Sequence, residues 1–412
     1  MSLTVEILST GDELLTGQIV DTNSVWLMDR LWDQGLMVRR KTLVGDDRDD
    51  LLAALRETTA RADVVVMSGG LGPTEDDLTA ECVAAAMGVK LVEDAASLEA
   101  IRRRIARMGR RVMTPNNAKQ ARFPEGATII PNRFGTAPGF VVRLGRAELV
   151  CLPGVPVEYR GLCDEAVLPR ISARTGAVFA ARVVKLIGIP ESHADQAMRP
   201  LMDAPENAGV RFGYRAHWPE IHVKWSVPGA DAEPHADRIL VEVRRIFGDA
   251  IFATGKEELA QLVVEQLVAR GQRLALAESC TGGLVAEMIT SVPGASRTFD
   301  LGIVAYANEM KEAVVGVPPD TLAAHGAVSE PVARALAEGA RQRAGTTWGI
   351  GITGVAGPDG GTAEKPVGTV HLAIAGGGGT RTWERHFVGD RDRIRKMAAY
   401  DALDQLRLLT RA

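Results

Sequence analysis

The sequence has few cysteines, and their spacing excludes two classes of protein. Among 412 residues there are four, Cys82, Cys151, Cys163 and Cys280. No two form a Cys-x-x-Cys pair and none has a histidine at metal-ligand spacing, so neither a disulfide framework nor a cysteine-based zinc site is expected. Such cysteine usage fits a reducing compartment, and we expect a cytoplasmic protein.

Long apolar runs and an excess of positive charge are also missing. No window approaches 18 apolar residues, and the chain begins with a strand-like segment that has no basic flank, so neither membrane insertion nor export is expected. The formal net charge is -4, whereas proteins that bind phosphate backbones usually carry a basic face. Nucleic acid is therefore not the expected ligand. The length predicts roughly two to four domains.

The first third of the chain alternates strand and helix patterns. Strand-like runs cover residues 3–8, 35–44 and 63–67. Asp21 precedes a helical pattern, and further helices are expected over 49–59 and 80–87. This alternation predicts a doubly wound α/β domain.

A glycine-rich loop, Ser-Gly-Gly-Leu-Gly-Pro-Thr-Glu-Asp-Asp-Leu-Thr, follows the third of these strands. In open α/β sheets ligands bind beyond the carboxyl ends of strands, and Gly69, Gly70 and Gly72 would let backbone N–H groups approach a phosphate. Asp76 and Asp77 would repel that phosphate unless a divalent cation lay between them, which favours a hard-metal, phosphate-ester site. The alternative is a pair of acids that stabilises a helix N-terminus.

Several motifs together resemble the molybdopterin-binding-like domain of the CinA family. They are Gly11-Asp-Glu-Leu14, the glycine loop, Asn116-Asn-x-Lys119-Gln, Pro131-Asn132, Gly135-Thr-Ala-Pro-Gly139 and Leu152-Pro-Gly-Val-Pro-x-Glu158. The resemblance implies hydrolysis of ADP-ribose to AMP and ribose 5-phosphate with a divalent metal ion of unspecified identity at Asp76 and Asp77. It also implies five further site residues: Asp21, Asn23, Lys119, Asn132 and Glu158.

Residues 170–255 have a different pattern, with strands expected at 182–187, 210–214 and 221–227 and helices at 192–202 and 236–247. This small α+β module resembles the KH-like middle domain of the longer CinA proteins, but it lacks the Gly-x-x-Gly loop with which KH domains read nucleic acid. We expect a spacer or a homodimer contact here rather than RNA binding. Four histidines have no metal-ligand spacing and are expected to be surface or structural residues: His193, His217, His222 and His235.

The last third contains the motif Ala-Glu-Ser-Cys-Thr-Gly-Gly between an alternating apolar run and a periodic one, so it predicts a turn from a strand into a helix. Backbone N–H groups at a helix start attract anions, and Gly282 and Gly283 would allow close approach. The alternative is that Ser279 or Thr281 only caps the helix. A second α/β domain is predicted from strands at 299–306, 348–352, 368–375 and 380–388 and helices at 258–269, 331–344 and 391–409.

This segment resembles the C-terminal CinA domain, whose members hydrolyse nicotinamide mononucleotide to nicotinic acid mononucleotide and ammonia without a cofactor. The supporting motifs are the Ala277 to Gly283 stretch, Tyr306-x-Asn-x-x-Lys311, Gly351-Ile-Thr-Gly-x-Ala-Gly-Pro358 and Gly389-Asp-Arg-x-x-Ile-Arg395. The resemblance makes Ser279 the nucleophile and Lys311 its base. The remaining roles it implies are orientation of the dyad or polarisation of the amide by Tyr306 and Thr353, phosphate binding by Arg391 and Arg395, and substrate binding at Cys280, Thr281, Gly282, Gly283, Asn308 and Gly354.

The residue types suit amide hydrolysis. A serine attacks a carboxamide only if a neighbouring base takes its proton, and no histidine lies in these motifs, so Lys311 is the candidate base if burial lowers its pKa. Cys280 is the alternative nucleophile, because a thiol ionises more readily than an alcohol. Arg391 and Arg395 lie four residues apart on one helix face and could bind a phosphate, or they form only a solvated face beside acidic neighbours.

Three domains are therefore predicted, at residues 1–169, 170–255 and 256–412. The first hypothesis is a bifunctional enzyme that acts on nicotinamide mononucleotide and ADP-ribose. The second, suggested by the competence and DNA-damage name of the family, is a binding protein with a recombination-protein partner, whose first domain holds a pterin or nucleotide without turnover. The third keeps only the amidase active.

Overall fold

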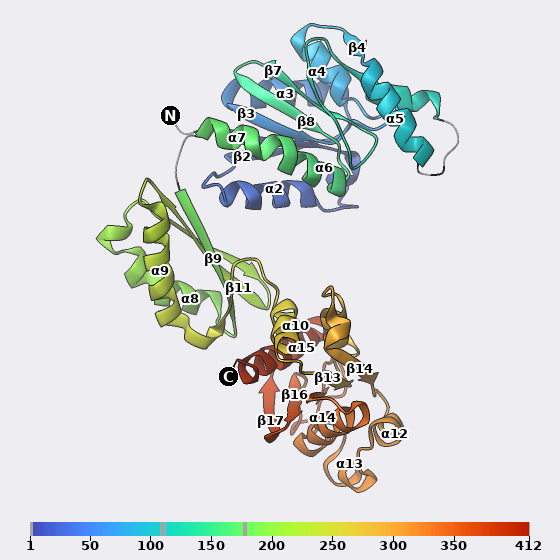
Figure 1. The fold of residues 1–412 in the computed structure, drawn as a ribbon, viewed down its shortest axis with the longest axis vertical. Coiled ribbons are helices and arrows are strands. Elements are labelled where there is room, and N and C mark those ends of the chain that lie inside the picture. Colours follow the sequence, from blue (N-terminus) through green and yellow to red (C-terminus); the bar gives the residue numbers. More distant parts are fainter. Residues whose placement is uncertain (1–2, 108, 110–112, 176–178, 412) are drawn as a thin grey trace. The chain divides into compact units, whose positions relative to one another are not determined.

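The computed structural model describes residues 3–107, 109, 113–175 and 179–411 (Figure 1). They form two compact units. The first comprises Met1–Ala181, Gly209–Arg211 and Ser226–Asp237, and the second comprises Arg182–Ala208, Phe212–Trp225 and Arg238–Ala412. A search of the described residues finds no helix that is both long and apolar enough to cross a membrane.

The amino-terminal domain is built on a six-stranded sheet of order β2-β1-β3-β8-β7-β6. The first four strands in this order are parallel, and the last two run antiparallel to their neighbours. The strands are β1 (Val5–Thr10), β2 (Arg40–Val44), β3 (Val64–Ser68), β6 (Thr128–Ile130), β7 (Gly139–Leu144) and β8 (Ala147–Leu152). A separate two-stranded sheet pairs β4 (Leu91–Glu93) with β5 (Arg122–Pro124).

Helices cover both faces of the six-stranded sheet, because its central strands are apolar on both sides. Leu8, Val65 and Met67 pack with α3 (Arg48–Arg61) and α4 (Thr79–Met87). Val64 and Val66 pack on the other face with α2 (Thr22–Trp32), α6 (Pro156–Leu162) and α7 (Leu168–Thr175). This confirms the predicted doubly wound domain. Its remaining α-helices are α1 (Asp12–Leu15), which is a single turn, and α5 (Ala95–Arg107).

The middle segment forms a four-stranded sheet of order β10-β11-β9-β12. Its strands are β9 (Phe179–Ile187), β10 (Arg211–His217), β11 (Glu220–Pro228) and β12 (Ile251–Thr254), and its helices are α8 (Glu191–Met202) and α9 (Ala232–Phe247). Helix α9 buries Ala232, Ala236, Ile239 and Val243 at helical spacing. The predicted α+β class is confirmed.

The carboxyl-terminal domain has a five-stranded sheet of order β14-β13-β15-β16-β17. Strands β13 (Leu274–Glu278), β14 (Phe299–Val304) and β15 (Trp348–Gly354) are parallel, whereas β16 (Thr369–Gly376) and β17 (Gly379–His386) are antiparallel. One face packs against α10 (Leu259–Ala269), α11 (Leu284–Thr290) and α15 (Arg391–Leu409). The other packs against α14 (Glu330–Ala344), and α12 (Asn308–Met310) and α13 (Pro319–His325) lie in the connection that precedes α14.

Candidate active sites

Three predicted residues of the last domain lie at one edge of its sheet. Ser279 directly follows β13, Tyr306 follows β14, and Thr353 lies near the end of β15. The backbone N–H of Ser279 donates to the Ile352 carbonyl at 3.0 Å, which ties the turn to β15. The carboxyl ends of parallel strands therefore bring these residues together, at the edge where α/β sheets bind ligands.

The helix after this turn is capped by a residue that was not selected from the sequence. Glu278 is almost fully buried, and its carboxylate accepts hydrogen bonds from the N–H groups of Gly283, Val285 and Ala286 at 3.1, 3.1 and 2.9 Å. The N-cap is Gly283, without a side-chain cap, so the alternative that Ser279 or Thr281 caps the helix is wrong. Because Glu278 occupies these donors, the expectation that they bind substrate needs correction.

The N–H groups of Cys280 and Thr281 remain as donors in this turn, and both face the Cys280 sulfur. Burial raises the pKa of the Cys280 thiol to about 12, despite those two donors. A thiol with this pKa is protonated at neutral pH and gives up the advantage that ionisation brings to a cysteine nucleophile. Thr281 is fully buried, and its hydroxyl has no partner among the described residues.

Lys311 is the buried cation of this site. It is 1% exposed and begins a π-helical segment, Lys311–Val315, and its ammonium donates to the Tyr306 carbonyl at 2.9 Å. In the described part of the chain it forms no ion pair and no hydrogen bond with Ser279. Burial lowers the pKa of Lys311, which is the change that a lysine base requires. Catalytic hydrogen bonds often form only when substrate binds, so a Ser279–Lys311 pair does not require this hydrogen bond in the substrate-free structure.

Tyr306 and Thr353 differ in what they can do. The Thr353 hydroxyl is buried and donates to the Ala327 carbonyl at 2.7 Å, so its proton already has an acceptor. The Tyr306 side chain is exposed, and its hydroxyl accepts a hydrogen bond from Arg391 at 2.9 Å. Thr353 is suited to hold the loop in place, while Tyr306 is suited to meet a ligand.

Arg391 and Arg395 face the site rather than their acidic neighbours. Arg391 also donates to the Gly357 carbonyl at 2.8 Å, and Arg395 donates to the Thr281 carbonyl at 2.8 and 3.2 Å. The alternative of a purely solvated face is therefore wrong. Three other predicted positions lie in the same segments. Gly282 is exposed, and an added Cβ would lie 3.6 Å from the Arg395 guanidinium. Asn308 is exposed at the start of α12, and Gly354 ends β15, where it pairs with Val370.

The amino-terminal domain has a cleft of about 530 Å³ beyond the carboxyl ends of β1, β3 and β8. Among its described lining residues there is no lysine or arginine. Six carboxylates line it: Glu13, Asp21, Asp46, Asp76, Asp77 and Glu158. An anionic substrate would be repelled from such a surface unless a cation accompanied it.

The glycine loop forms one wall of this cleft. Gly69 has φ +107°, and a Cβ there would lie 2.4 Å from the Thr10 carbonyl oxygen, so this position requires glycine. The N–H of Gly69 donates to the Leu152 carbonyl at 3.0 Å, and that of Gly72 donates to Asp77 at 2.7 Å. The expectation of three phosphate donors therefore reduces to the Gly70 N–H, the one without a partner in the described chain.

The two predicted metal ligands have unequal surroundings. Asp77 accepts from the Gly72 N–H, the Thr74 N–H and the Thr74 hydroxyl at 2.7, 2.8 and 2.5 Å, so it fixes the loop. Asp76 is exposed, and hydrogen bonding, first from the Thr74 side chain, lowers its pKa. No third acid, histidine or cysteine of the described chain completes a preformed cluster with them. Mg²⁺ is usually bound by one or two carboxylates together with water and substrate oxygens, rather than by protein ligands alone, so this pair of acids suits it.

Asp21 and Asn23 hold the opposite wall. Asp21 is the N-cap of α2 and pairs with Lys41 at 2.9 Å. Burial opposes its charge, but hydrogen bonds from Ser24, Lys41 and Ser9 outweigh this and lower its pKa. The Asn23 amide donates to the Gly154 carbonyl at 2.7 Å, which leaves its buried oxygen without a partner among the described residues.

The other predicted residues divide between the cleft and its support. Asn132 donates to Glu158 at 2.5 Å and positions that acid, whose pKa is raised by burial. The Lys119 ammonium donates to the Thr74 carbonyl at 2.9 Å and lies outside the lining. Asp46 also lines the cleft, where it accepts a hydrogen bond from the Asp12 N–H at 3.1 Å and burial raises its pKa. It was missed from the sequence because no glycine-rich loop surrounds it.

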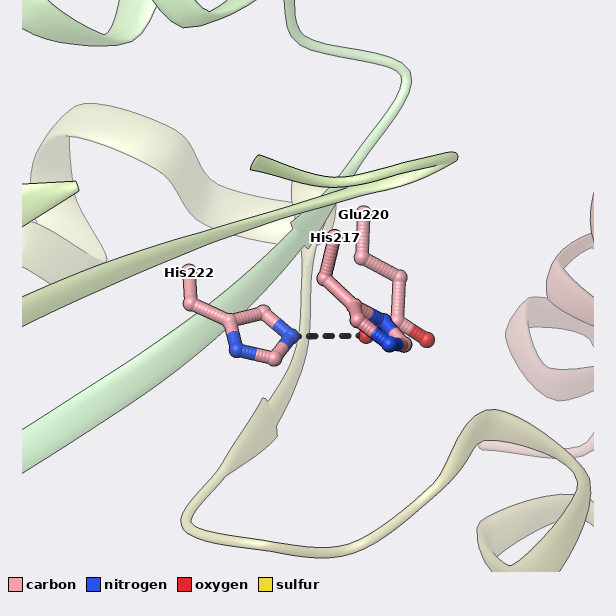
Figure 2. A group of neighbouring side chains, drawn as sticks. All are labelled: His217, Glu220 and His222. Atoms are coloured by element: carbon pink, nitrogen blue, oxygen red, sulfur yellow. Dashed lines mark hydrogen bonds and ion pairs between the residues drawn. The ribbon is translucent and has the colours of Figure 1, made fainter. Parts of the chain in front are cut away.

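His217 is exposed, and His222 is buried and hydrogen-bonded to Glu220, so both fit the expectation of surface or structural histidines. His217, Glu220 and His222 place one possible ligand atom each within 4.8 Å of the others (Figure 2). Their sequence spacing crosses a two-residue turn between strands, so it matches no motif of consecutive metal ligands. Glu220 was missed for the same reason.

Comparison with known proteins assigns all three segments. Residues 6–173 match the probable molybdopterin binding domain, residues 181–253 the damage-inducible protein CinA KH domain, and residues 256–410 the CinA C-terminal domain. These matches define the class: a chain that joins a molybdopterin-binding-like domain, a KH-like module and a CinA domain.

Full-length relatives narrow this class to a family. A CinA-like protein of Anaeromyxobacter sp. (strain Fw109-5) is 70% identical over 411 residues and covers 100% of both chains. Another, of Anaeromyxobacter dehalogenans (strain 2CP-1 / ATCC BAA-258), is 69% identical and covers 99% of this chain and 100% of its own. The crystal structure of competence/damage inducible protein CihA from Agrobacterium tumefaciens is 40% identical, covers 37% of this chain and 93% of that one, and has a TM-score of 0.36. The chain belongs to the CinA family.

Proposed function

We propose that the carboxyl-terminal domain hydrolyses the carboxamide of nicotinamide mononucleotide with Ser279 as nucleophile and Lys311 as base. The observation that carries this proposal is a buried lysine without an ion-pair partner in the described chain, at the sheet edge where a serine follows a parallel strand. An unpaired buried lysine is costly unless it gives up its proton, and a neutral amine is a competent base. The family resemblance supports the substrate.

In the proposed reaction, the Ser279 oxygen bonds to the amide carbon while Lys311 takes the hydroxyl proton. The N–H groups of Cys280 and Thr281 are the candidates to stabilise the oxyanion. Lys311 then donates its proton to the leaving nitrogen, and ammonia departs. Water next attacks the acyl-enzyme, and Lys311 passes the proton from water back to the serine oxygen. No metal or redox cofactor takes part in this scheme.

The two arginines would bind the 5′-phosphate of this substrate. Arg391 and Arg395 rise from one face of α15, and their hydrogen bonds already join Tyr306 and Thr281 to that helix. A phosphate between them would gain two charge-assisted contacts. Tyr306, exposed beside Arg391, is placed to contact the same nucleotide.

We further propose that the amino-terminal cleft hydrolyses ADP-ribose to AMP and ribose 5-phosphate with a divalent metal ion. The described lining has six carboxylates and no basic side chain, so it would bind an anionic pyrophosphate only together with a cation. Asp76 and Asp77 would hold the ion, which when bound supplies positive charge to the pyrophosphate oxygens. The Gly70 N–H would contact a phosphate oxygen, and Asn23 and Glu158 would orient polar groups of the substrate.

One experiment separates the three hypotheses. The purified full chain is incubated with nicotinamide mononucleotide and with ADP-ribose, each with Mg²⁺ or with a chelator, and ammonia and AMP are measured. Release of both products, with AMP alone depending on metal, is the expected result. Ammonia without AMP leaves only the amidase, and neither product, with ligand binding retained, supports a binding protein in recombination.

A further inference from the structure

The turn between β10 and β11 carries a cluster of metal-ligand atoms that the proposed activities do not use. His217 ends β10, and Glu220 and His222 lie two residues apart in β11 (Figure 2). Residues two apart on a strand share a face, and the residues that flank a two-residue turn lie opposite each other. The hairpin therefore directs all three side chains to the same side.

The distances between these groups suit one ion. The His222 Nε2 and a Glu220 oxygen are 2.8 Å apart, and the ligand atoms of all three residues lie within 4.8 Å of one another. Two ligands on a tetrahedral zinc ion lie about 3.4 Å apart, given bond lengths of about 2.1 Å. The separation between His222 and Glu220 is shorter than this value and no pair exceeds 4.8 Å, so side-chain rotation would bring the three groups onto one centre.

Glu220 supplies an independent reason to expect a cation. Its side chain is fully buried, one carboxylate oxygen bonds to His222, and the other has no hydrogen-bond partner in the described chain. A buried carboxylate oxygen without a partner costs free energy, which a bound cation would offset. The Tyr400 hydroxyl faces the same acid. Within the part of the chain that the structure describes, His222 is the one ion-pair partner of Glu220.

We propose that His217, Glu220 and His222 form a binding site for a zinc-class transition-metal dication. Two imidazoles and one carboxylate are the ligand set of open tetrahedral zinc sites, and the exposed position of His217 leaves the fourth place to water. The ion clamps the end of the hairpin, where Trp218 stacks under Arg393 at 4.8 Å. Because Arg393 belongs to α15, the ion steadies a contact between the hairpin and this helix.

The test is metal binding by the full chain after removal of bound metal with a chelator. Zn²⁺ is titrated calorimetrically in excess Mg²⁺, which occupies hard oxygen sites elsewhere, and Co²⁺ replaces it for visible absorption spectroscopy. We expect one Zn²⁺ per chain and a Co²⁺ spectrum with the intensity of a tetrahedral nitrogen and oxygen site. His217→Ala should weaken zinc binding more than roughly 100-fold, beyond the loss of an outer-shell partner.

Matched variants keep the result interpretable. His193→Ala removes an exposed histidine of the same module outside the cluster and should leave affinity unchanged. Glu220→Gln keeps the shape of the buried side chain but removes its charge, so it should also lose zinc. If Glu220→Gln fails to fold, the zinc affinity of His217→Ala, a substitution of an exposed residue, still tests the proposal. Equal zinc affinity in the wild type and His217→Ala, or equal loss in His193→Ala, would overturn the proposal.

Discussion

In water Cys280 would be a better nucleophile than Ser279, but its burial removes that advantage. Because the pKa of the thiol is raised to about 12, it is protonated at neutral pH, whereas Lys311 is available to deprotonate an alcohol. We expect Ser279→Ala to lower amidase turnover by roughly 10³-fold or more. Cys280→Ala should cost less than about tenfold, or about 1.4 kcal/mol of barrier.

The kinetics of these two variants check the assignment, with nucleotide binding measured separately to exclude misfolding. Alkylation of the wild type adds a second readout, because a buried neutral thiol should react slowly. A dead Cys280→Ala enzyme and an active Ser279→Ala enzyme would make the domain a cysteine amidase.

The buried Lys311 predicts how activity and stability depend on pH. Since burial lowers its pKa, the neutral base forms as pH rises through a value below the usual lysine range, so amidase kcat should rise with pH and level off there. The folded state binds this proton less tightly than the unfolded state, so the contribution of Lys311 to stability is lost as pH falls through the lowered pKa.

Lys311→Met tests both consequences at once. The substitution keeps apolar bulk and removes the charge, so at pH 7 it should abolish turnover yet raise the free energy of unfolding by on the order of 1 kcal/mol. Turnover is measured across pH and stability by denaturant titration. A variant that is less stable than wild type at neutral pH, or a flat wild-type pH profile, would contradict a lysine base.

At the scale of elements, we expect substitutions of the two adjacent acids in the glycine loop to differ in their effect on stability. Asp77 holds the loop through three hydrogen bonds, whereas Asp76 is exposed. Asp76→Ala should therefore abolish metal-dependent AMP release with a smaller loss of stability than Asp77→Ala. Asp77→Ala should also abolish it, but with a loss of about 1–3 kcal/mol of stability from the unpaired loop N–H groups. In both, amidase rates should be unchanged because the domains fold around separate cores.

Activity of each variant with both substrates, and its thermal melting, separate these effects. A similar loss of stability in Asp76→Ala would mean that the exposed acid also supports the loop. Loss of amidase activity in either variant would mean that the two sites are coupled.

The elements that the sequence predicted well depend on local signals. The last helix is predicted at residues 391–409, and α15 has these bounds, with Asp390 as its N-cap. The functional details that were missed depend on contacts across a turn. Glu278 reaches the N–H groups of α11 from the end of β13, and His217 meets His222 across a hairpin. No sequence period records either arrangement.

At the scale of the whole molecule, strand β12 belongs to the middle sheet but also packs into the last domain. Phe252 and Ala253 of β12 belong to the hydrophobic core of the last domain, although the sequence pattern places the end of the middle segment at residue 255. The fully buried Arg407 donates to the Asp249 carbonyl at 2.9 Å, and Arg411 pairs with the Asp249 carboxylate at 2.9 Å. A fragment that starts at residue 255 lacks all of these contacts.

We therefore expect two fragments, 248–412 and 255–412, to differ although both contain every amidase motif. Loss of a buried phenylalanine alone costs about 3–5 kcal/mol, and an arginine left with one carboxylate partner adds to this. The shorter fragment should be less stable by at least about 3 kcal/mol, a large share of the stability of a single domain. The longer fragment should keep amidase activity near that of the full chain. Denaturant titration and ammonia release measure both. Equal stability would mean that β12 contributes nothing to this core, and a folded but inactive longer fragment would mean that residues before 248 complete the site.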